Sequence, residues 1–288
     1  MHSNDLIRWQ SDNNSASRGQ WEGFSRHRFR VTSLLRENRC PKESRLCVLG
    51  AGNCNDLDLG RLLELHESIA LVDLDFAALT GGVEKQQFSH CTSIQPIGGV
   101  DLTGILDVIS GWSSKASIPA SDIAALAEWP SQRVARTLCG PYDVVASTCL
   151  LSQIIGNAFR VVGRQHPQFM DVVRAIRVGH LRLMAELCKP GGRVVLITDV
   201  VSSDIAPTLK MTAESDLAVL LPALIRNGLF INGVNPEAIA STFRMDPILN
   251  SVVVGLERTA PWFWRLHERL YVVLAFQYRK SSASLLSI

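Results

Sequence analysis

Two features of the sequence could do chemistry together: a turn bracketed by glycines and a carboxylate that follows a second apolar run. Gly50-x-Gly52 follows the apolar run 45–49, and Asp73 follows the apolar run 69–72. Glycine lets a backbone approach a ligand closely, and a helix that begins after such a turn offers free N–H groups. A carboxylate only accepts hydrogen bonds, so it suits the two hydroxyls of a ribose. The pair, one strand–helix step apart, predicts a ligand that contains a ribose.

Other types of site are less well supported by the residues. Asp73 or Asp75 could simply cap the next helix; we assign the cap to Asp75 and the ribose to Asp73, which directly follows the strand. A dinucleotide fingerprint has a third glycine where this chain has Asn55, and no Walker loop follows. We expect no metal site, since the histidines show no paired spacing and His-Glu-x-x-His is absent.

An alternation of strands and helices must position these residues. Short apolar runs predict strands at 45–49, 69–72, 93–97, 142–147 and 193–198. Helical patterns lie between them, notably at 76–88 and from Asp171, as the cap, to 187. The alternation predicts a parallel sheet covered on both faces, with ligands at the carboxyl ends of its strands. Two late runs, 251–256 and 270–278, predict an antiparallel pair that closes the sheet.

The N-terminal part differs from the rest in composition. Residues 1–20 are polar and are expected to be a frayed terminus. A helix is predicted from Trp21 to Arg39, with Pro41 ending it. We therefore divide the chain into an N-terminal tail and helix, 1–41, and a domain, 42–288. Within that domain, 104–139 and 200–234 are predicted insertions.

Composition limits the class of protein. Of the 288 residues, 47% are apolar and 19% are charged, which is enough apolar material for a sizeable core. The net charge of +2 gives no electrostatic case for nucleic acid or membrane as a partner. Seven dispersed cysteines without a Cys-x-x-Cys pair argue against a disulfide scaffold, and together with the absence of a secretory leader they favour the cytoplasm.

The order of the motifs resembles the class I S-adenosylmethionine-dependent methyltransferases over roughly residues 45–200. The resemblance implies an α/β, Rossmann-like fold: a mostly parallel, seven-stranded sheet with helices on both faces and an antiparallel C-terminal strand. The most characteristic piece is the turn Lys189-Pro190-Gly191-Gly192 before the fifth strand. The other matching segments are Val48–Leu57, Leu71–Asp75, Asp101-Leu102 and Tyr142–Val145.

The resemblance also implies roles for single residues and S-adenosyl-L-methionine as the cofactor. The first loop would pass the methionine part, Asp73 with Leu74 would hold the ribose, Asp101 with Leu102 would meet the adenine, and the fourth strand's end would line the methyl-donor side. The implied cofactor-binding residues are Gly50, Ala51, Gly52, Asn53, Asp73, Leu74, Asp101, Leu102, Ser147 and Thr148. The fourth strand lacks the Asn/Asp-Pro-Pro-Tyr motif, which is the usual signature of methylation at a base amino group or a glutamine amide. The N-terminal helix could act as a lid, as such helices do in similar enzymes.

No catalytic motif is evident, and methyl transfer does not require one. Holding a nucleophile near the methyl carbon can supply roughly 7–11 kcal/mol of the barrier. Substrate-side candidates are Gln153, His166, Asp199 and His267. His180, on an apolar-periodic helix, is expected in the core. The Trp262/Trp264 pair is expected to be packing rather than a cage for a cation.

The sequence thus favours a methyltransferase with an unidentified acceptor. A small molecule is preferred, a protein substrate is possible, and neither nucleic acid nor membrane is expected. One alternative is a nicotinamide-dependent oxidoreductase, which Asn55 disfavours. The other is a non-catalytic module that keeps the fold and presents 217–225 and 261–264 as a partner surface.

Overall fold

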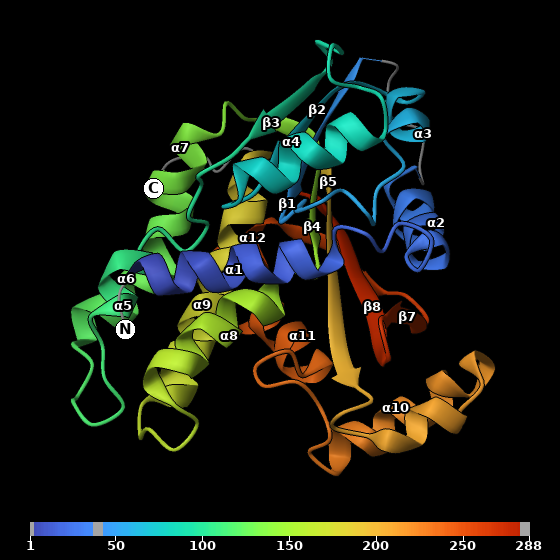
Figure 1. Cartoon of the computed structure of the whole chain (residues 1–288). Coiled ribbons are helices and arrows are strands. Elements are labelled where there is room, and N and C mark those ends of the chain that lie inside the picture. The colour runs from blue at the N-terminus through green and yellow to red at the C-terminus, as the bar shows by residue number, and fades with distance from the viewer. Residues whose placement is uncertain (1–2, 37–42, 283–288) are drawn as a thin grey trace.

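The computed structural model describes residues 3–36 and 43–282, built around a single eight-stranded sheet (Figure 1). The strands are β1 (Ser44–Leu49), β2 (His66–Val72), β3 (Ile94–Ile97), β4 (Tyr142–Thr148), β5 (Cys188–Ser202), β6 (Val253–Arg258), β7 (Trp262–Leu266) and β8 (Arg269–Lys280). Their order is β3-β2-β1-β4-β5-β8-β6, and β7 pairs with β8. Neighbours among β1 to β5 are parallel, whereas β8 is antiparallel to both β5 and β6.

The predicted Rossmann-like α/β fold is therefore confirmed, with one strand added. The main path has seven strands and an antiparallel C-terminal strand, as expected. The additional strand is β7, formed by the aromatic stretch that the sequence placed between the last two strands. β3 lies at an edge of the sheet, as its proline predicts.

Helices and short turns cover both faces of the sheet (Figure 1). The α-helices are α1 (Ser3–Ser17), α2 (Ser25–Arg36), α3 (Leu59–Leu63), α4 (Phe76–Lys85), α5 (Leu106–Ser110), α6 (Ala120–Trp129), α7 (Ala135–Thr137), α8 (Leu151–Val162), α9 (Phe169–Leu187), α10 (Leu217–Arg226), α11 (Pro236–Met245) and α12 (Pro247–Val252). A π-helical turn, η1 (Pro130–Val134), joins α6 to α7, and two 3₁₀ turns, η2 (Pro207–Met211) and η3 (Glu214–Asp216), precede α10.

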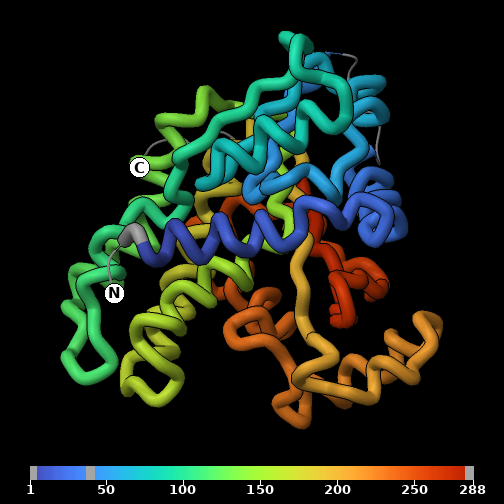
Figure 2. Tube along the Cα trace, viewed as in Figure 1, coloured from blue at the N-terminus to red at the C-terminus, as the bar shows by residue number. Residues whose placement is uncertain are grey.

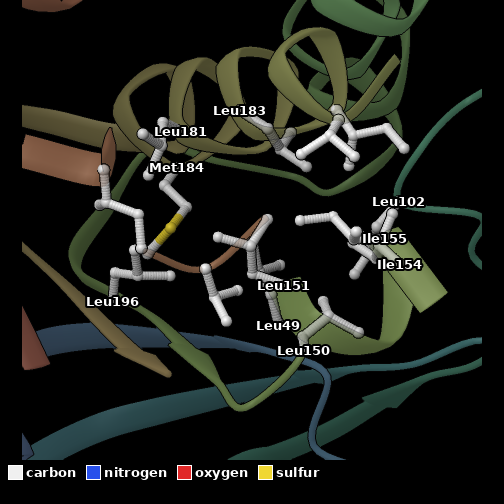
Figure 3. Packing of buried hydrophobic residues seen from close by; sticks show 14 of the residues in the cluster. Leu49, Leu102, Leu150, Leu151, Ile154, Ile155, Leu181, Leu183, Met184 and Leu196 are labelled. Carbon is white, nitrogen blue, oxygen red and sulfur yellow. The ribbon is translucent and has the colours of Figure 1, made fainter. Parts of the chain in front are cut away.

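The sheet separates two hydrophobic cores, and alternate residues of each strand enter one or the other. In β1, Leu46 and Val48 join the core shared with α2 and α3, while Leu49 joins the core under α8 and α9. Figure 3 shows Leu151 of α8 and Met184 of α9 packed with Leu49 in the second of these cores. Burial on both faces explains why the strands appear in the sequence as nearly continuous apolar runs.

The prediction of a frayed N-terminus is wrong. The polar segment forms α1, which runs across the front of the molecule in Figure 1. Leu6 is fully buried, and several polar side chains of α1 bond to the loops beneath it. These partners are distant in the sequence, so the polarity of the segment alone misleads. The predicted 21–39 helix forms as α2, while its predicted end at Arg39 and Pro41 lies outside the described residues.

Predicted boundaries of two elements are also wrong. The fifth strand begins at Cys188, so it includes the predicted turn 189–192, and it does not end at Asp199 but continues to Ser202, because β8 pairs with it that far. The long helix α9 begins at Phe169, so Asp171 lies in its first turn and is not its cap. By contrast, Asp75 caps α4 as assigned, accepting a hydrogen bond from the backbone N of Ala78 at 3.0 Å.

Gly82 fixes how closely α4 packs against the loop after β1. A Cβ atom on Gly82 would lie 2.4 Å from the backbone O of Asn53, whereas one on Gly81 would meet nothing within 4 Å. The loop that carries Gly52 is therefore supported from below by helix backbone, at a distance that only glycine permits.

The two neighbouring glycines give a matched test of this contact. We expect Gly82→Ala to lower the free energy of unfolding by about 1–3 kcal/mol, because the added methyl overlaps backbone. Gly81→Ala, in the same helix but in open space, should instead raise it by about 0.5–1 kcal/mol. Urea denaturation of both variants measures the difference, and equal effects would contradict the close approach of α4.

Candidate functional site

The backbone N of Gly52 donates a hydrogen bond to Oδ2 of Asp73 at 2.9 Å, and this contact joins the two predicted features. The other oxygen, Oδ1, accepts from the backbone N of Asp75, also at 2.9 Å. A carboxylate offers about four lone-pair sites, and the backbone of Leu74 also acts as a donor to Asp73, so its lone pairs are only partly used. Asp73 is 3% exposed, and burial raises the pKa of its carboxyl despite these backbone donors.

Both glycines of the first loop are in the left-handed region and have no room for a side chain. Gly50 has φ +77°, and a Cβ there would lie 2.7 Å from the Cβ of Leu150. Gly52 has φ +45°, and a Cβ there would lie 3.0 Å from Oδ1 of Asn14, which α1 places over the loop. Both positions therefore favour glycine, because the backbone is left-handed there and because a neighbouring side chain lies close to where a Cβ would be.

Two cavities lie at the carboxyl edge of the sheet, on either side of the Gly52–Asp73 contact. The smaller, of about 30 Å³, is lined by Asp73, Leu74, Asp101 and Leu102, with Gln10 of α1 closing it. The larger, of about 620 Å³, is lined by all the other predicted cofactor-binding residues except Ser147. These lining residues are Gly50, Ala51, Gly52, Asn53 and Thr148. The structure therefore gathers residues from four separate loops around one pair of cavities.

Ser147 is the exception. It is fully buried, and its Oγ lies 2.8 Å from Nε2 of His180 in the core beneath α9. Neither cavity is lined by it. His180 itself is buried as expected, and burial lowers its pKa to about 4. We therefore leave Ser147 out of the proposed site.

The carboxylate of Asp101 shapes its own loop while facing the smaller cavity. Its Oδ1 accepts from the backbone N and the Oγ1 of Thr103, at 2.9 and 2.6 Å, and its Oδ2 accepts from the backbone N of Leu106 at 2.7 Å. These bonds hold the loop after β3 in place beside Leu102.

The element that covers the cavities is α1, and not α2. Gln10 of α1 donates to Gln153 at 2.8 Å, and Asn53 donates to the backbone O of Asn14. The helix thus spans the loops after β1 and β4, as its path in Figure 2 shows. In α2, His27 and Val31 are buried against the sheet and β7. The predicted lid role therefore passes to α1, as a proposal.

Three of the four substrate-side candidates line the larger cavity: Gln153, Asp199 and His267. His166 does not line either cavity. Its ring instead joins two loops, since Nε2 lies 3.0 Å from the backbone O of Ala116 and Nδ1 accepts from the backbone N of Gln168 at 3.1 Å.

Asp56 is a cavity residue that the sequence analysis missed. It lines the larger cavity while being 9% exposed, and burial raises its pKa to about 7. A hydrogen bond with Thr148 and the charge of Arg28 act in the opposite direction. Its position in the motif after the glycine turn was visible, but its burial depends on α2 and β4, which are distant in the sequence.

The aromatic residues beside the larger cavity form a stack. Trp264 lies between His27 and Tyr271, with ring centroids 5.0 Å from each. Trp262 donates from Nε1 to Nδ1 of His27 at 3.1 Å. Both faces of Trp264 are therefore occupied, and the expectation that the tryptophan pair is packing is confirmed. The same burial removes these aromatics from the partner surface that the module alternative would need.

The described residues contain neither a cluster of metal ligands nor a helix that could span a membrane. Among residues 3–36 and 43–282, no group of three or more His, Cys, Asp or Glu side chains is placed to hold a metal ion. Within the same ranges, no helix is both long enough and apolar enough to cross a membrane.

Comparison with known proteins finds similarity in structure but not in sequence. No family model and no curated protein match the chain. Similar solved structures include the N-methyltransferase NodS from Bradyrhizobium japonicum WM9 (11% identity, TM-score 0.46, 90% of this chain and 97% of that one). A complex of NodS with S-adenosyl-L-homocysteine is also similar (12%, TM-score 0.43, 89% and 87%). So is an rRNA methylase from Streptococcus thermophilus (10%, TM-score 0.42, 87% and 93%).

These similarities are too distant to carry an argument about function. They are to methyltransferases, the class that the sequence motifs resemble, and the acceptors that the names of these proteins indicate differ. Exclusion of nucleic acid as a partner therefore stays a prediction. A functional conclusion has to rest on the geometry of the site in this chain.

The buried carboxyl of Asp56 makes a testable contribution to stability. A carboxyl whose folded pKa of about 7 exceeds its unfolded value of 3.8 stabilises the fold most at low pH, and that stabilisation is lost as pH rises through 7. Between pH 5 and pH 8, the free energy of unfolding of the wild type should therefore fall by about 3 kcal/mol relative to that of Asp56→Asn. Urea denaturation across this range measures the change. The control Asp171→Asn removes an exposed carboxylate, and a curve for Asp56→Asn that runs parallel to wild type would refute the assignment.

Proposed function

We propose that this chain is an S-adenosyl-L-methionine-dependent methyltransferase. The observation that carries the proposal is the hydrogen bond from Gly52 to Asp73 at the junction of two cavities. The free lone pairs of Asp73 suit the two hydroxyls of a ribose. Asp101 and Leu102 would meet the adenine in the smaller cavity, and the loop Gly50–Asn53 would pass the methionine part in the larger one.

The residues present fit such a cofactor on two further observations. Oδ1 of Asn55, a residue that is 3% exposed and lines the larger cavity, has no hydrogen-bond partner within the described part of the chain. An ammonium group on the methionine part would supply the missing donor. A Cβ on Gly50 would overlap Leu150 and one on Gly52 would crowd Oδ1 of Asn14, so both positions keep bare backbone beside the larger cavity.

The chemistry asks little of the protein beyond placement. When bound, the cofactor supplies a sulfonium-activated methyl group. This chain's residues would orient it through Asp73, hold the acceptor in line in the larger cavity, and exclude water beneath α1. Proximity and orientation of this kind can supply roughly 7–11 kcal/mol of the barrier.

Cofactor entry would require α1 to shift. A cavity of about 30 Å³ has room for only one or two water molecules, not for an adenine ring. Gln10 and Asn14, the α1 side chains above Asp73 and Gly52, are the groups that would move. These two side chains make hydrogen bonds to Gln153 and Asp75, and exchanging those bonds for ligand contacts would cost little.

The remaining expectations about partners stay proposals. A small-molecule acceptor stays preferred over a protein because the sequence shows neither a basic groove nor the motif of amide methylation. A cytoplasmic location and the exclusion of nucleic acid and membrane rest on the composition of the sequence alone.

Titration calorimetry tests the proposal directly. We expect S-adenosyl-L-homocysteine to bind with micromolar affinity and NADH not to bind. Asp73→Ala should weaken binding by about 10–100-fold, since a hydrogen bond to a charged group is worth roughly 1.5–3 kcal/mol. Asp73→Asn, which keeps one acceptor oxygen for Gly52, controls for loss of the loop contact. Asp171→Ala, which removes an exposed side chain of α9, should bind as wild type does.

Thermal melts establish that each variant is folded before its affinity is compared. Binding of NADH but not of S-adenosyl-L-homocysteine would reverse the choice in favour of an oxidoreductase. Binding of neither ligand would favour the non-catalytic module.

A further inference from the structure

The larger cavity contains one buried carboxyl group without a cationic partner, that of Asp199. Its side chain is 94% buried by the fold, since Asp199 is 6% exposed. Oδ1 accepts a hydrogen bond from Oγ of Ser152 in the first turn of α8, at 2.6 Å. Within the described part of the chain, Oδ2 accepts none from another residue. Burying a carboxylate in this way is costly unless a positive charge or a further donor compensates it.

The other charged groups that line this cavity are already paired or lie at its rim. Asp204 pairs with Arg269 at 2.8 Å, and Arg269 is the one Lys or Arg side chain among the described lining residues. Asp56 has the charge of Arg28 nearby and a hydrogen bond with Thr148. Glu268 is exposed at the rim. An anionic acceptor would therefore find no free cation here, whereas a cationic one would find Asp199.

The buried histidine of the cavity, His27, does not supply a positive charge either. Nδ1 of His27 accepts a hydrogen bond from Trp262, which requires a neutral ring that carries its proton on Nε2. Burial lowers its pKa to about 3. His267 lies at the exposed edge, where Nε2 is 3.1 Å from the backbone O of Ala16 in α1.

Asp199 is also at a suitable distance from the cofactor loop. In the register of the sheet, Leu49 of β1 is opposite Ser147 of β4, and Thr148 is opposite Ile197 of β5. Asp199 therefore lies two strands away from Gly50, about 10 Å across the sheet, and two residues further along β5. That span leaves room for a methyl group and for an attacking atom about 3–3.5 Å from it.

We infer that the methyl acceptor is a small amine, held by its nitrogen against Asp199 in the larger cavity. The inference rests on the proposed function. The bound ammonium gives one proton to Oδ2 of Asp199, and the freed nitrogen lone pair forms a bond to the methyl carbon. The carbon–sulfur bond breaks with its electron pair going to sulfur, which leaves S-adenosyl-L-homocysteine and the methylated, protonated amine. Asp199 passes its proton to solvent when the product leaves.

Two features of the site support this role for Asp199. The hydroxyl of Ser152 fixes the carboxyl group, so that Oδ2 is the oxygen that meets the acceptor. Burial raises the pKa of Asp199 to about 6, which brings the group nearer to neutral pH than an exposed aspartate and so nearer to the value that proton transfer favours. Tyr271 also lines the cavity, and the nearby charge of Asp199 raises the pKa of Tyr271. The ring of Tyr271 offers apolar surface to the carbon chain of the amine.

The test measures release of S-adenosyl-L-homocysteine with acceptors matched in carbon skeleton. One set is phenethylamine, phenethyl alcohol and phenylacetate, and a second is butylamine, butanol and butyrate. Each further amine is likewise compared with the alcohol and the carboxylate of the same carbon skeleton. We expect turnover with amines only. Asp199→Asn should lower kcat/KM by about 10²–10⁴-fold, the range of a general base, while the Kd for S-adenosyl-L-homocysteine changes less than about threefold. Asp171→Asn should match wild type.

Each other outcome decides against the inference. Methylation of the alcohols or carboxylates in preference to the amines overturns it, and so does an Asp199→Asn variant that methylates amines as fast as wild type. Binding of S-adenosyl-L-homocysteine without turnover of any amine also overturns the acceptor class while leaving the proposed function intact. If S-adenosyl-L-homocysteine does not bind at all, the proposed function itself fails and the acceptor inference falls with it.

Discussion

The hydrogen bond from the backbone of Gly52 to the carboxylate of Asp73 ties the end of β1 to the end of β2, and the site is arranged around it. The bond requires a glycine in the left-handed conformation at position 52. It also requires that Asp73 does not cap α4, and Asp75 is the cap instead. It also requires α4 to support the loop from below, which Gly82 permits. Because these requirements come from three separate elements, the junction between the two cavities is fixed by the fold as a whole.

The second constraint is the polar helix α1 that closes the site. Its hydrogen bonds connect it to the loops after β1 and β2 and to the first turn of α8, and each of these segments also contributes to a cavity wall. Apart from the buried Leu6, these contacts are polar, and a polar ligand can replace them at little net cost, since hydrogen bonds are exchanged rather than lost. We infer that α1 excludes water from the site and gives way when the cofactor enters. The larger cavity, where Asp199 has no cationic partner among the described residues, lies under the same helix.

Features with a local cause could be predicted from the sequence. The apolar runs gave the strands because both faces of the sheet are buried, and Asp75 was recognised as a cap because capping needs only neighbouring residues. Features decided by distant contacts could not. The segment forming α1 is polar and acquires its order from loops far along the chain, and Asp56 is buried by elements that its own neighbours do not reveal. The position of Ser147, which lines neither cavity, could not be predicted for another reason: strand alternation separates it from Thr148, but the sequence does not say which of the two faces the cavity.

A crystal structure of the full chain with S-adenosyl-L-homocysteine bound would show directly whether Asp73 holds the ribose. We expect both ribose hydroxyl oxygens within about 3 Å of the Asp73 carboxylate oxygens, with the adenine beside Leu102 and α1 moved outward from its present position. A nucleoside bound elsewhere, or one that leaves Asp73 bonded only to Gly52 and Asp75, would contradict it.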